Sequence, residues 1–328
     1  MRFSIGFPSL PATYVWSYGV NPSGTMTFQT QEGFTLMDES LYTREFIEEF
    51  GTVAIGAGFH AMHFTEHPAP SRRWLETGGH EALDPLVALG VLAGANTELR
   101  LLTQLTILPY KNPLLFAKSA ATLDRLSNGR VTLGVGAGYL KSEFRALGVD
   151  FDERNDLFDE TLRVCRLAWS GEAFDYEGRH FSARDIRTLP TPLQDPLPLW
   201  IGGNSALSRR RAVHSAQGWI PQPNPRSIAA SRRSAALETL EDLERMLDEL
   251  RALAREIGRT APIDVMFTSY AGGSPLASGW DPRKRVDDIR AQESLGVTWH
   301  QTNPVGGSPG AILDWTRCYG EDVISAYR

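Results

Sequence analysis

The sequence has few cysteines, no strong excess of one charge and no long apolar run. Cys165 and Cys318 are the two cysteines in 328 residues. Each lies in a pattern typical of a helix, so we expect buried thiols and a reducing cytoplasm rather than a disulfide framework. The net charge of -6 gives no general attraction to nucleic acid or to an anionic membrane. We also expect no signal peptide and no membrane span.

Several catalytic motifs are missing as well. No G-x-S-x-G nucleophile signature occurs, which gives acyl transfer no support. The glycine run 133–139 fails the dinucleotide fingerprint, because Tyr139 stands where a glycine is needed. No Gly-Lys-Ser/Thr follows it to make a phosphate loop. A Rossmann domain is therefore not predicted.

Short apolar runs alternate with longer segments of helical period along the whole chain, and 42% of the residues are hydrophobic, enough for a large core. The predicted strands cover residues 3–7, 61–65, 99–108, 131–135, 199–202, 218–221, 263–268 and 297–302. The predicted helices cover residues 41–56, 85–96, 113–126, 153–169, 205–216, 226–257, 282–295 and 311–327. This alternation predicts an α/β protein with one domain, a parallel (β/α)8 TIM barrel over residues 1–328.

Three segments interrupt the alternation, and we interpret each as an insertion. Residues 8–40 form a long Gly/Thr/Gln-rich connection that we expect to be a lid. Residues 173–198 predict a hairpin followed by a proline-rich stretch. Residues 271–281 are small and glycine-rich, which indicates a loop near the barrel mouth.

Catalytic groups of such barrels lie at the carboxyl ends of the strands, and the second strand ends in Glu66 and His67. His67 is suited to donate a hydrogen bond or to transfer a proton near neutral pH. Its alternative role is to pin the loop to the backbone. His60 and His63 lie nearby, which raises the alternative of a metal-dependent hydrolase. The two-residue period of a strand puts His63 and His67 on one face, and His60 and Glu66 on the other, so we predict no metal site.

Three further strand ends have distinct patterns. The run around Gln104, Leu105 and Thr106 is by itself an ordinary strand exit. Gly136, Ala137, Gly138 and Tyr139 allow a ligand to approach the backbone or allow a strand and helix to pack tightly. Gly202, Gly203, Asn204 and Ser205 precede a helix, where exposed amides can bind a phosphate. The arginines at 209–211 form an exposed or salt-bridged face, or attract an anionic cofactor tail.

Taken together, the motifs resemble those of the luciferase-like monooxygenase superfamily, flavin- or deazaflavin-dependent oxidoreductases, and most closely its coenzyme F420-dependent branch. The motifs that carry the resemblance are Pro109-Tyr110-Lys111-Asn112-Pro113, Ala121-Thr122-Leu123-Asp124-Arg125-Leu126-Ser127, Leu133-Gly134-Val135-Gly136-Ala137-Gly138, Glu143-Phe144 and Trp200-Ile201-Gly202-Gly203-Asn204-Ser205. One departure is Tyr139, because deazaflavin sugar-phosphate dehydrogenases of this superfamily have a glutamate directly after the glycine run.

The resemblance implies a ring of F420 or FMN lying across the carboxyl end of the barrel. It places Glu66 and His67 facing the ring, and a non-proline cis peptide under the ring near Gln104, Leu105 and Thr106. It places residues 136–139 along the ring or its ribityl chain, and residues 202–205 on the phosphate. It also suggests a homodimer.

Three functional hypotheses follow. The first is an oxidoreductase that transfers a hydride between F420 and a small organic substrate, with His67 orienting or protonating the reacting centre. The second is a monooxygenase that uses reduced FMN from a separate reductase. The third is a flavin-binding protein without turnover. The aromatic residues expected at the mouth suggest an apolar or planar substrate, or else lid packing: Tyr14, Trp16, Tyr18, Phe28 and Trp74.

Overall fold

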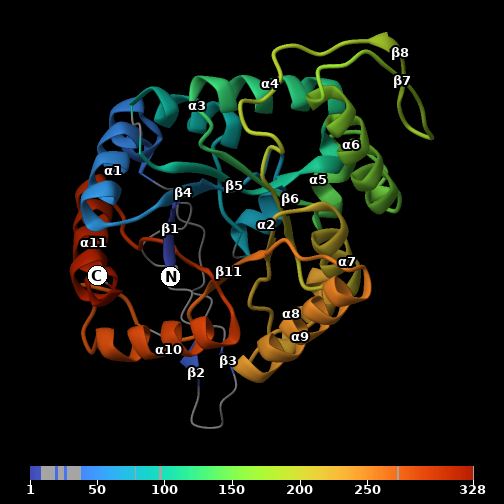
Figure 1. Cartoon of the computed structure of the whole chain (residues 1–328). Helices are drawn as coiled ribbons and strands as arrows, with labels where there is room; N and C mark the ends of the chain where they lie inside the picture. The colour runs from blue at the N-terminus through green and yellow to red at the C-terminus, as the bar shows by residue number, and fades with distance from the viewer. Residues whose placement is uncertain are drawn as a thin grey trace.

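The protein is a closed barrel of parallel strands, seen in a computed structural model that describes residues 1–8, 19–20, 26–27, 38–77, 79–95, 98–271 and 273–327. Around the barrel the strands follow the order β1-β12-β11-β10-β9-β6-β5-β4 (Figure 1). Their bounds are β1 (Arg2–Gly6), β4 (Ala61–Phe64), β5 (Arg100–Ile107), β6 (Val131–Gly136), β9 (Leu199–Gly202), β10 (Gly218–Ile220), β11 (Asp264–Thr268) and β12 (Trp299–Thr302). The prediction of a (β/α)8 TIM barrel is confirmed.

Most helices surround the strands as an outer ring, whereas the short helix α2 is drawn near the middle of the view (Figure 1). The described α-helices are α1 (Arg44–Ala57), α2 (Arg72–Glu76), α3 (Pro85–Ala95), α4 (Pro113–Leu126), α5 (Lys141–Ala146), α6 (Arg154–Trp169), α7 (Ala206–Ser215), α8 (Arg226–Arg232), α9 (Leu240–Glu256), α10 (Pro282–Leu295) and α11 (Pro309–Asp322). Three short 3-10 helices are η1 (Glu39–Tyr42), η2 (Leu108–Tyr110) and η3 (Ile324–Tyr327). Among the helices of the described ranges, none combines the length and the apolar character needed to cross a bilayer.

One predicted helix is wrong. The single helix expected over residues 226–257 is two helices, α8 and α9. Arg233 ends α8 in the left-handed region at φ 50°, and Leu237 then pairs with Asn224 in an isolated antiparallel bridge. The Thr239 side chain caps α9 by accepting a hydrogen bond from the Asp242 amide at 3.2 Å. Because Arg233 is not a glycine, the helical period gave no sign of this break.

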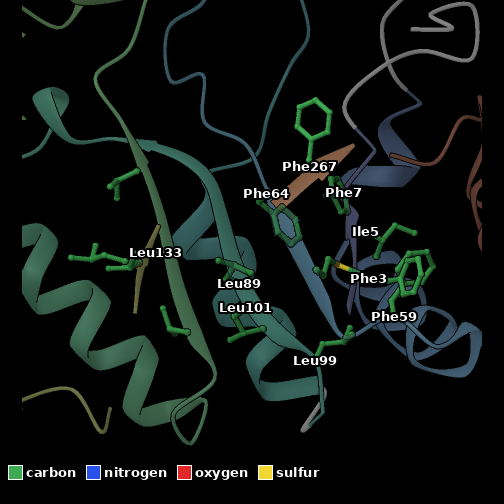
Figure 2. Close-up of a cluster of buried hydrophobic side chains, with 14 of the residues drawn as sticks. Phe3, Ile5, Phe7, Phe59, Phe64, Leu89, Leu99, Leu101, Leu133 and Phe267 are labelled. Atoms are coloured by element: carbon green, nitrogen blue, oxygen red, sulfur yellow. The ribbon is translucent and has the colours of Figure 1, made fainter. Parts of the chain in front are cut away.

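The core has two layers, which follow from the alternation of side chains along each strand. Phe3 and Ile5 of β1 point away from the barrel axis and belong to the large cluster between strands and helices (Figure 2). A smaller buried cluster also spans several strands: Ala61, Leu102, Trp200, Ile220, Met266 and Trp299. These two layers fix the strand ends, on which the site is built.

The predicted insertions differ in what the structure describes. Most of residues 8–40, with Tyr14, Trp16, Tyr18 and Phe28, lies outside the described residues, apart from the short pair β2 (Gly19–Val20) and β3 (Met26–Thr27). Residues 173–198 contain the antiparallel strands β7 (Phe174–Glu177) and β8 (Ser182–Ile186). In the third segment, Trp280 Nε1 donates to Asp322 Oδ2 at 2.7 Å, which ties it to α11.

Candidate active site

The exits of β4, β5 and β6 lie beside one another, because these strands are neighbours in the parallel barrel. Met62 is in register with Leu101, and Leu101 in register with Val131. Between Thr103 and Thr106 the register of β5 with β6 shifts by a bulge. Loops that are distant in sequence therefore meet on one rim of the barrel, where catalytic groups of this fold occur.

Glu66 joins the first two of these exits. Its carboxylate, 3% exposed, accepts a hydrogen bond from the Ile107 amide at 2.7 Å and forms an ion pair with Lys111. Burial raises the pKa of Glu66, while the charge of Lys111 and the hydrogen bond from Ile107 act in the opposite direction. Both carboxylate oxygens are thus bound by protein donors. These contacts give Glu66 a positioning role at the rim.

His67 lies next to a second buried carboxylate, Glu143 of α5. The distance from His67 Nδ1 to Glu143 Oε2 is 3.3 Å, and both side chains are buried. Glu143 also accepts hydrogen bonds from the Tyr110 hydroxyl at 3.2 Å and from the Ala69 amide at 3.4 Å. Burial and the negative charge of Glu143 raise the pKa of Tyr110, so its proton stays on the hydroxyl. Glu143 therefore holds groups from the exits of β4 and β5.

Aromatic rings surround the imidazole of His67. Trp74 lies 4.5 Å away between ring centroids, His80 4.7 Å and Tyr139 6.3 Å. Tyr139 is 41% exposed and so presents part of its ring to the outside. Burial, with a smaller contribution from His67, lowers the pKa of His80 to about 3. His80 is therefore neutral near pH 7 and packs against His67 as an uncharged ring.

The bulged end of β5 forms the floor beside these groups. The peptide bond between Gln104 and Leu105 is cis, at the place where the resemblance implies a cis peptide. The Leu105 side chain lies so close to Gly202 that an added Cβ there would be 2.1 Å from Leu105 Cδ1. At Gly136 the corresponding distance is 3.0 Å. A side chain at Gly202 would therefore force Leu105 to move, and the space at Gly136 is tight.

Two polar atoms on this floor lack partners. Gln104 Nε2 donates to Gln301 Oε1, and Gln301 Nε2 donates to Gln222 Oε1 at 3.3 Å. Gln104 Oε1 and Thr106 Oγ1 are buried and have no hydrogen-bond partner among the residues that the structure describes. Such atoms are costly unless something satisfies them. The polar edge of a flat flavin or deazaflavin ring offers both donors and acceptors, so the floor fits such a group.

The glycine run after β6 also packs tightly against protein. Gly138 has φ +76°, and an added Cβ would lie 2.8 Å from Ile107 and 2.9 Å from Phe144. Of the two roles open for residues 136–139, tight packing is therefore visible at Gly136 and Gly138. Ala137 lies between them, and Tyr139 reaches the His67 group.

The exit of β9 is more occupied than its sequence indicates. The Asn204 side chain is 1% exposed, accepts a hydrogen bond from the Gln222 amide at 2.9 Å, and donates to the Gln222 and Ala235 carbonyls at 2.7 and 3.0 Å. Ser205 caps α7 by accepting from the Ser208 amide at 3.0 Å. The Gly203 amide donates to Ile220 at 3.1 Å. A phosphate here would therefore rely on the amides at the start of α7 rather than on the Asn204 side chain.

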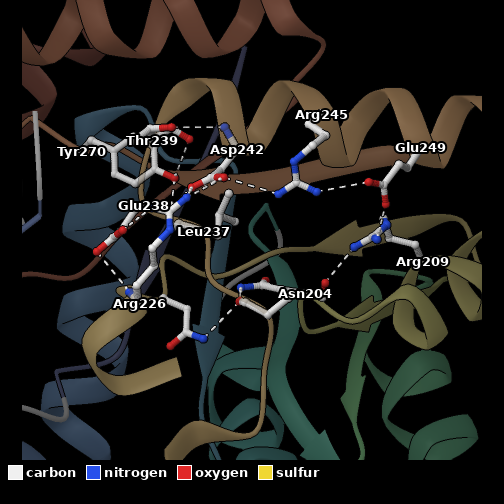
Figure 3. Close-up of polar contacts among 12 residues, drawn as sticks. Asn204, Arg209, Arg226, Leu237, Glu238, Thr239, Asp242, Arg245, Glu249 and Tyr270 are labelled. Atoms are coloured by element: carbon white, nitrogen blue, oxygen red, sulfur yellow. Dashed lines mark hydrogen bonds and ion pairs between the residues drawn. The ribbon is translucent and has the colours of Figure 1, made fainter. Parts of the chain in front are cut away.

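A network of ion pairs supports this exit from behind (Figure 3). Arg209 donates to the Asn204 carbonyl at 2.7 Å and pairs with Glu249 of α9. The charges then alternate along α9 toward the start of α8, through Arg245, Asp242, Arg226 and Glu238. Arg211 pairs with Asp159 of α6 at 2.7 Å. Arg209 and Arg211 are thus in the salt-bridged role, not on an open face that could attract a cofactor tail.

The remaining histidines of the second strand have separate partners. His60 Nδ1 accepts from the Phe3 amide at 3.1 Å, and His63 Nδ1 lies 2.8 Å from Ser4 Oγ. In the part of the chain that the structure describes, no group of three or more His, Cys, Asp or Glu side chains could hold a metal ion.

Sequence reasoning missed Glu143, Tyr110, His80, Lys111 and Gln301 as site residues. Glu143 and Tyr110 occur in the motifs of the resemblance but gave no local sign of a role. His80 and Gln301 reach the site only through the fold, so no spacing along the chain could have found them.

Comparison with known proteins identifies the class. The family model for luciferase-like monooxygenases matches residues 43–271, and the chain belongs to this family. It is 32% identical to an F420-dependent glucose-6-phosphate dehydrogenase of Microbacterium testaceum over 60% of this chain and 57% of that protein. It is 28% identical to the enzyme of the same name from Segniliparus rotundus over 84% of this chain and 77% of that protein. The monooxygenase RslO1 of Streptomyces bottropensis shares the fold at a TM-score of 0.76, with 19% identity and full coverage of both chains.

The buried histidines predict a loss of stability in acid. Burial lowers the pKa of His63 to about 3, whereas a histidine in an unfolded chain titrates near the ordinary value of 6.5. Below 6.5 the unfolded state binds a proton that the folded state refuses, so stability present above 6.5 is lost as the pH falls. We expect the free energy of unfolding, measured with urea, to fall about 1.4 kcal/mol less between pH 7.5 and 5.5 in His63→Gln than in the wild type. His214→Gln, at an exposed position of α7, is the control and should lose as much stability as the wild type. A fall in His63→Gln equal to that of the wild type would contradict the assignment.

Proposed function

We propose that this protein is an oxidoreductase that transfers a hydride between coenzyme F420 and a small organic substrate. The observation that carries the proposal is the buried pair of His67 and Glu143 on the rim, next to the unsatisfied floor of β5. Membership of the luciferase-like family and the names of the two relatives support the choice of cofactor.

The Glu143 carboxylate fixes the state of His67. A carboxylate can only accept hydrogen bonds, so the proton of a neutral His67 lies on Nδ1, toward Glu143. Nε2 then has the lone pair, and it takes or returns a proton at the reacting centre. Glu143 also stabilises the imidazolium when His67 is charged, and its bond to Tyr110 keeps the carboxylate in place. When bound, the deazaflavin supplies the site for the hydride.

Other residues would hold the cofactor rather than react. Gln104 and Thr106 offer the unsatisfied polar atoms to the ring, and Leu105 forms an apolar floor. Amides at the start of α7 would hold the phosphate, with support from the positive end of the helix. Trp74 and Tyr139 give the substrate side an aromatic character, which favours an apolar or planar substrate over a sugar phosphate.

A monooxygenase is the second candidate, favoured by the full-length structural similarity to RslO1. In that case reduced FMN would come from a separate reductase, because the sequence has no nicotinamide fingerprint. The same His67 and Glu143 pair would then hold or move the proton. A flavin-binding protein without turnover is the outcome in which binding occurs but no variant changes a rate.

Cofactor titration tests the proposal. We expect quenching of tryptophan fluorescence by F420 at micromolar concentration and weaker binding of FMN, each measured oxidised and reduced. Preference for reduced FMN would instead support the monooxygenase, and binding of neither would contradict both.

His67→Ala should retain F420 binding within about threefold but slow hydride transfer by about 10²-fold or more, measured by the loss of F420 absorbance under single-turnover conditions. An unchanged rate would contradict the role of His67.

We also propose that the protein is a cytoplasmic homodimer that pairs through α3 and α4. Helix α3 has no charged residue, yet Val87 on it is 72% exposed. On the neighbouring α4, Leu115 is 71% and Leu126 76% exposed. Exposed apolar side chains gathered on two packed helices are typical of an association surface. A two-fold axis would bring this surface against its copy.

Light scattering with size-exclusion chromatography tests the dimer. We expect the wild type to elute as a dimer and the double variant Val87→Glu/Leu115→Glu as a folded monomer, because each copy would bring two unpaired carboxylates into the interface. Leu276→Glu, at an exposed leucine in the loop after β11, is the matched control and should remain a dimer. A monomeric wild type would contradict the proposal.

A further inference from the structure

Three cations converge on one phenyl ring at the barrel rim. The charged group of Arg154 lies 4.0 Å from the ring centroid of Phe151, that of Arg233 4.6 Å and that of Lys141 5.1 Å. They come from three elements: Lys141 begins α5, Arg154 begins α6, and Arg233 ends α8. Figure 1 shows these three helices on the same side of the barrel. We call this group the cation cluster.

The cation cluster forms no ion pair with a carboxylate of the described residues. Lys141 and Arg233 are exposed and Arg154 is half-buried, and among the residues that the structure describes none forms an ion pair with them. Lys111, Arg209 and Arg211 each have such a pair. Burial and the positive charge of Arg233 lower the pKa of Arg154, while Asp152 acts in the opposite direction. Contact with the face of Phe151 offsets part of the repulsion. The remaining positive field attracts an anion.

The cluster lies between two exits of the proposed cofactor site. The rings of Phe151 and Phe144 pack edge to face with their centroids 5.0 Å apart. The Phe144 ring lies close to Gly138 after β6, where an added Cβ would be 2.9 Å from it. On the other side, Arg233 is followed by Ser234 and Ala235, and the Ala235 carbonyl accepts a hydrogen bond from Asn204 after β9. An anion on the cluster would thus be adjacent to a cofactor phosphate at the start of α7.

We infer that Lys141, Arg154 and Arg233 bind the acidic tail of F420, a flexible chain of carboxylates that continues beyond the phosphate of this cofactor. This inference rests on the proposed function. Since the amides of α7 are the candidates for the phosphate, the cluster forms a second anionic subsite. FMN ends at its phosphate and leaves such a subsite unused. Two of the arginines of α7 do not take this role, because Arg209 and Arg211 are already paired with Glu249 and Asp159.

The test compares ligands with and without the tail. Dissociation constants are measured by tryptophan quenching, at low and at high salt, for F420, for the deazaflavin riboside without phosphate and tail, for FMN and for riboflavin. The variant is Lys141→Gln/Arg233→Gln, which keeps the partly buried Arg154. The control is Arg255→Gln, at an exposed arginine in the last turn of α9 that does not belong to the cation cluster.

We expect the double variant to weaken F420 about tenfold at low salt and to reduce the salt dependence of its binding, with the riboside unchanged and FMN changed less than F420. Arg255→Gln should change none of these constants. Equal weakening of F420 and FMN would assign the cluster to the phosphate and overturn the inference. If the double variant binds F420 as tightly as the wild type does, the inference is overturned. If the variant loses thermal stability and binds F420 and the riboside equally more weakly, the cluster has only a structural role, which also overturns the inference. If the wild type binds neither F420 nor the riboside, the proposed function fails, and the inference fails with it.

Discussion

One buried carboxylate, that of Glu143, joins the exits of three neighbouring strands. It follows β6 and accepts hydrogen bonds from the loop after β4, through His67 and Ala69, and from the end of η2 after β5, through Tyr110. A hydrogen bond to a charged group contributes about 1.5–3 kcal/mol, and a buried charge without its partners costs more. The exits therefore keep one arrangement, and the orientation of His67 follows from it.

The rest of the rim repeats this construction. Glu66 joins β4 to β5 as Glu143 joins both to β6, and Asn204 joins β9 to the segment after β10. The buried side chains of Glu66, Glu143 and Asn204 thus hold the backbone of the rim in place. The site is pre-organised by buried polar contacts, a property that favours catalysis over loose binding.

Much of the fold could be predicted, because local patterns decide it. Apolar runs between turns placed the barrel strands within about two residues, and the segments of helical period between them placed most of the long helices. The break at Arg233 could not be predicted, since its left-handed conformation depends on the pairing of Leu237 with Asn224. His67 could be found from its strand end. The partner that orients it could not, because Glu143 is 76 residues away and its burial arises only in the closed barrel.

The tautomer of His67 reports whether Glu143 orients this imidazole. The nitrogen-15 shifts of its ring, assigned by their loss in His67→Gln, are recorded in the protein without cofactor at alkaline pH, where the neutral ring is observed. We expect a protonated Nδ1 and an unprotonated Nε2 in the wild type, and we expect this preference to be lost in Glu143→Leu. A proton on Nε2 in the wild type would contradict it, because Glu143 would then not hold His67 in the state that its proposed role requires.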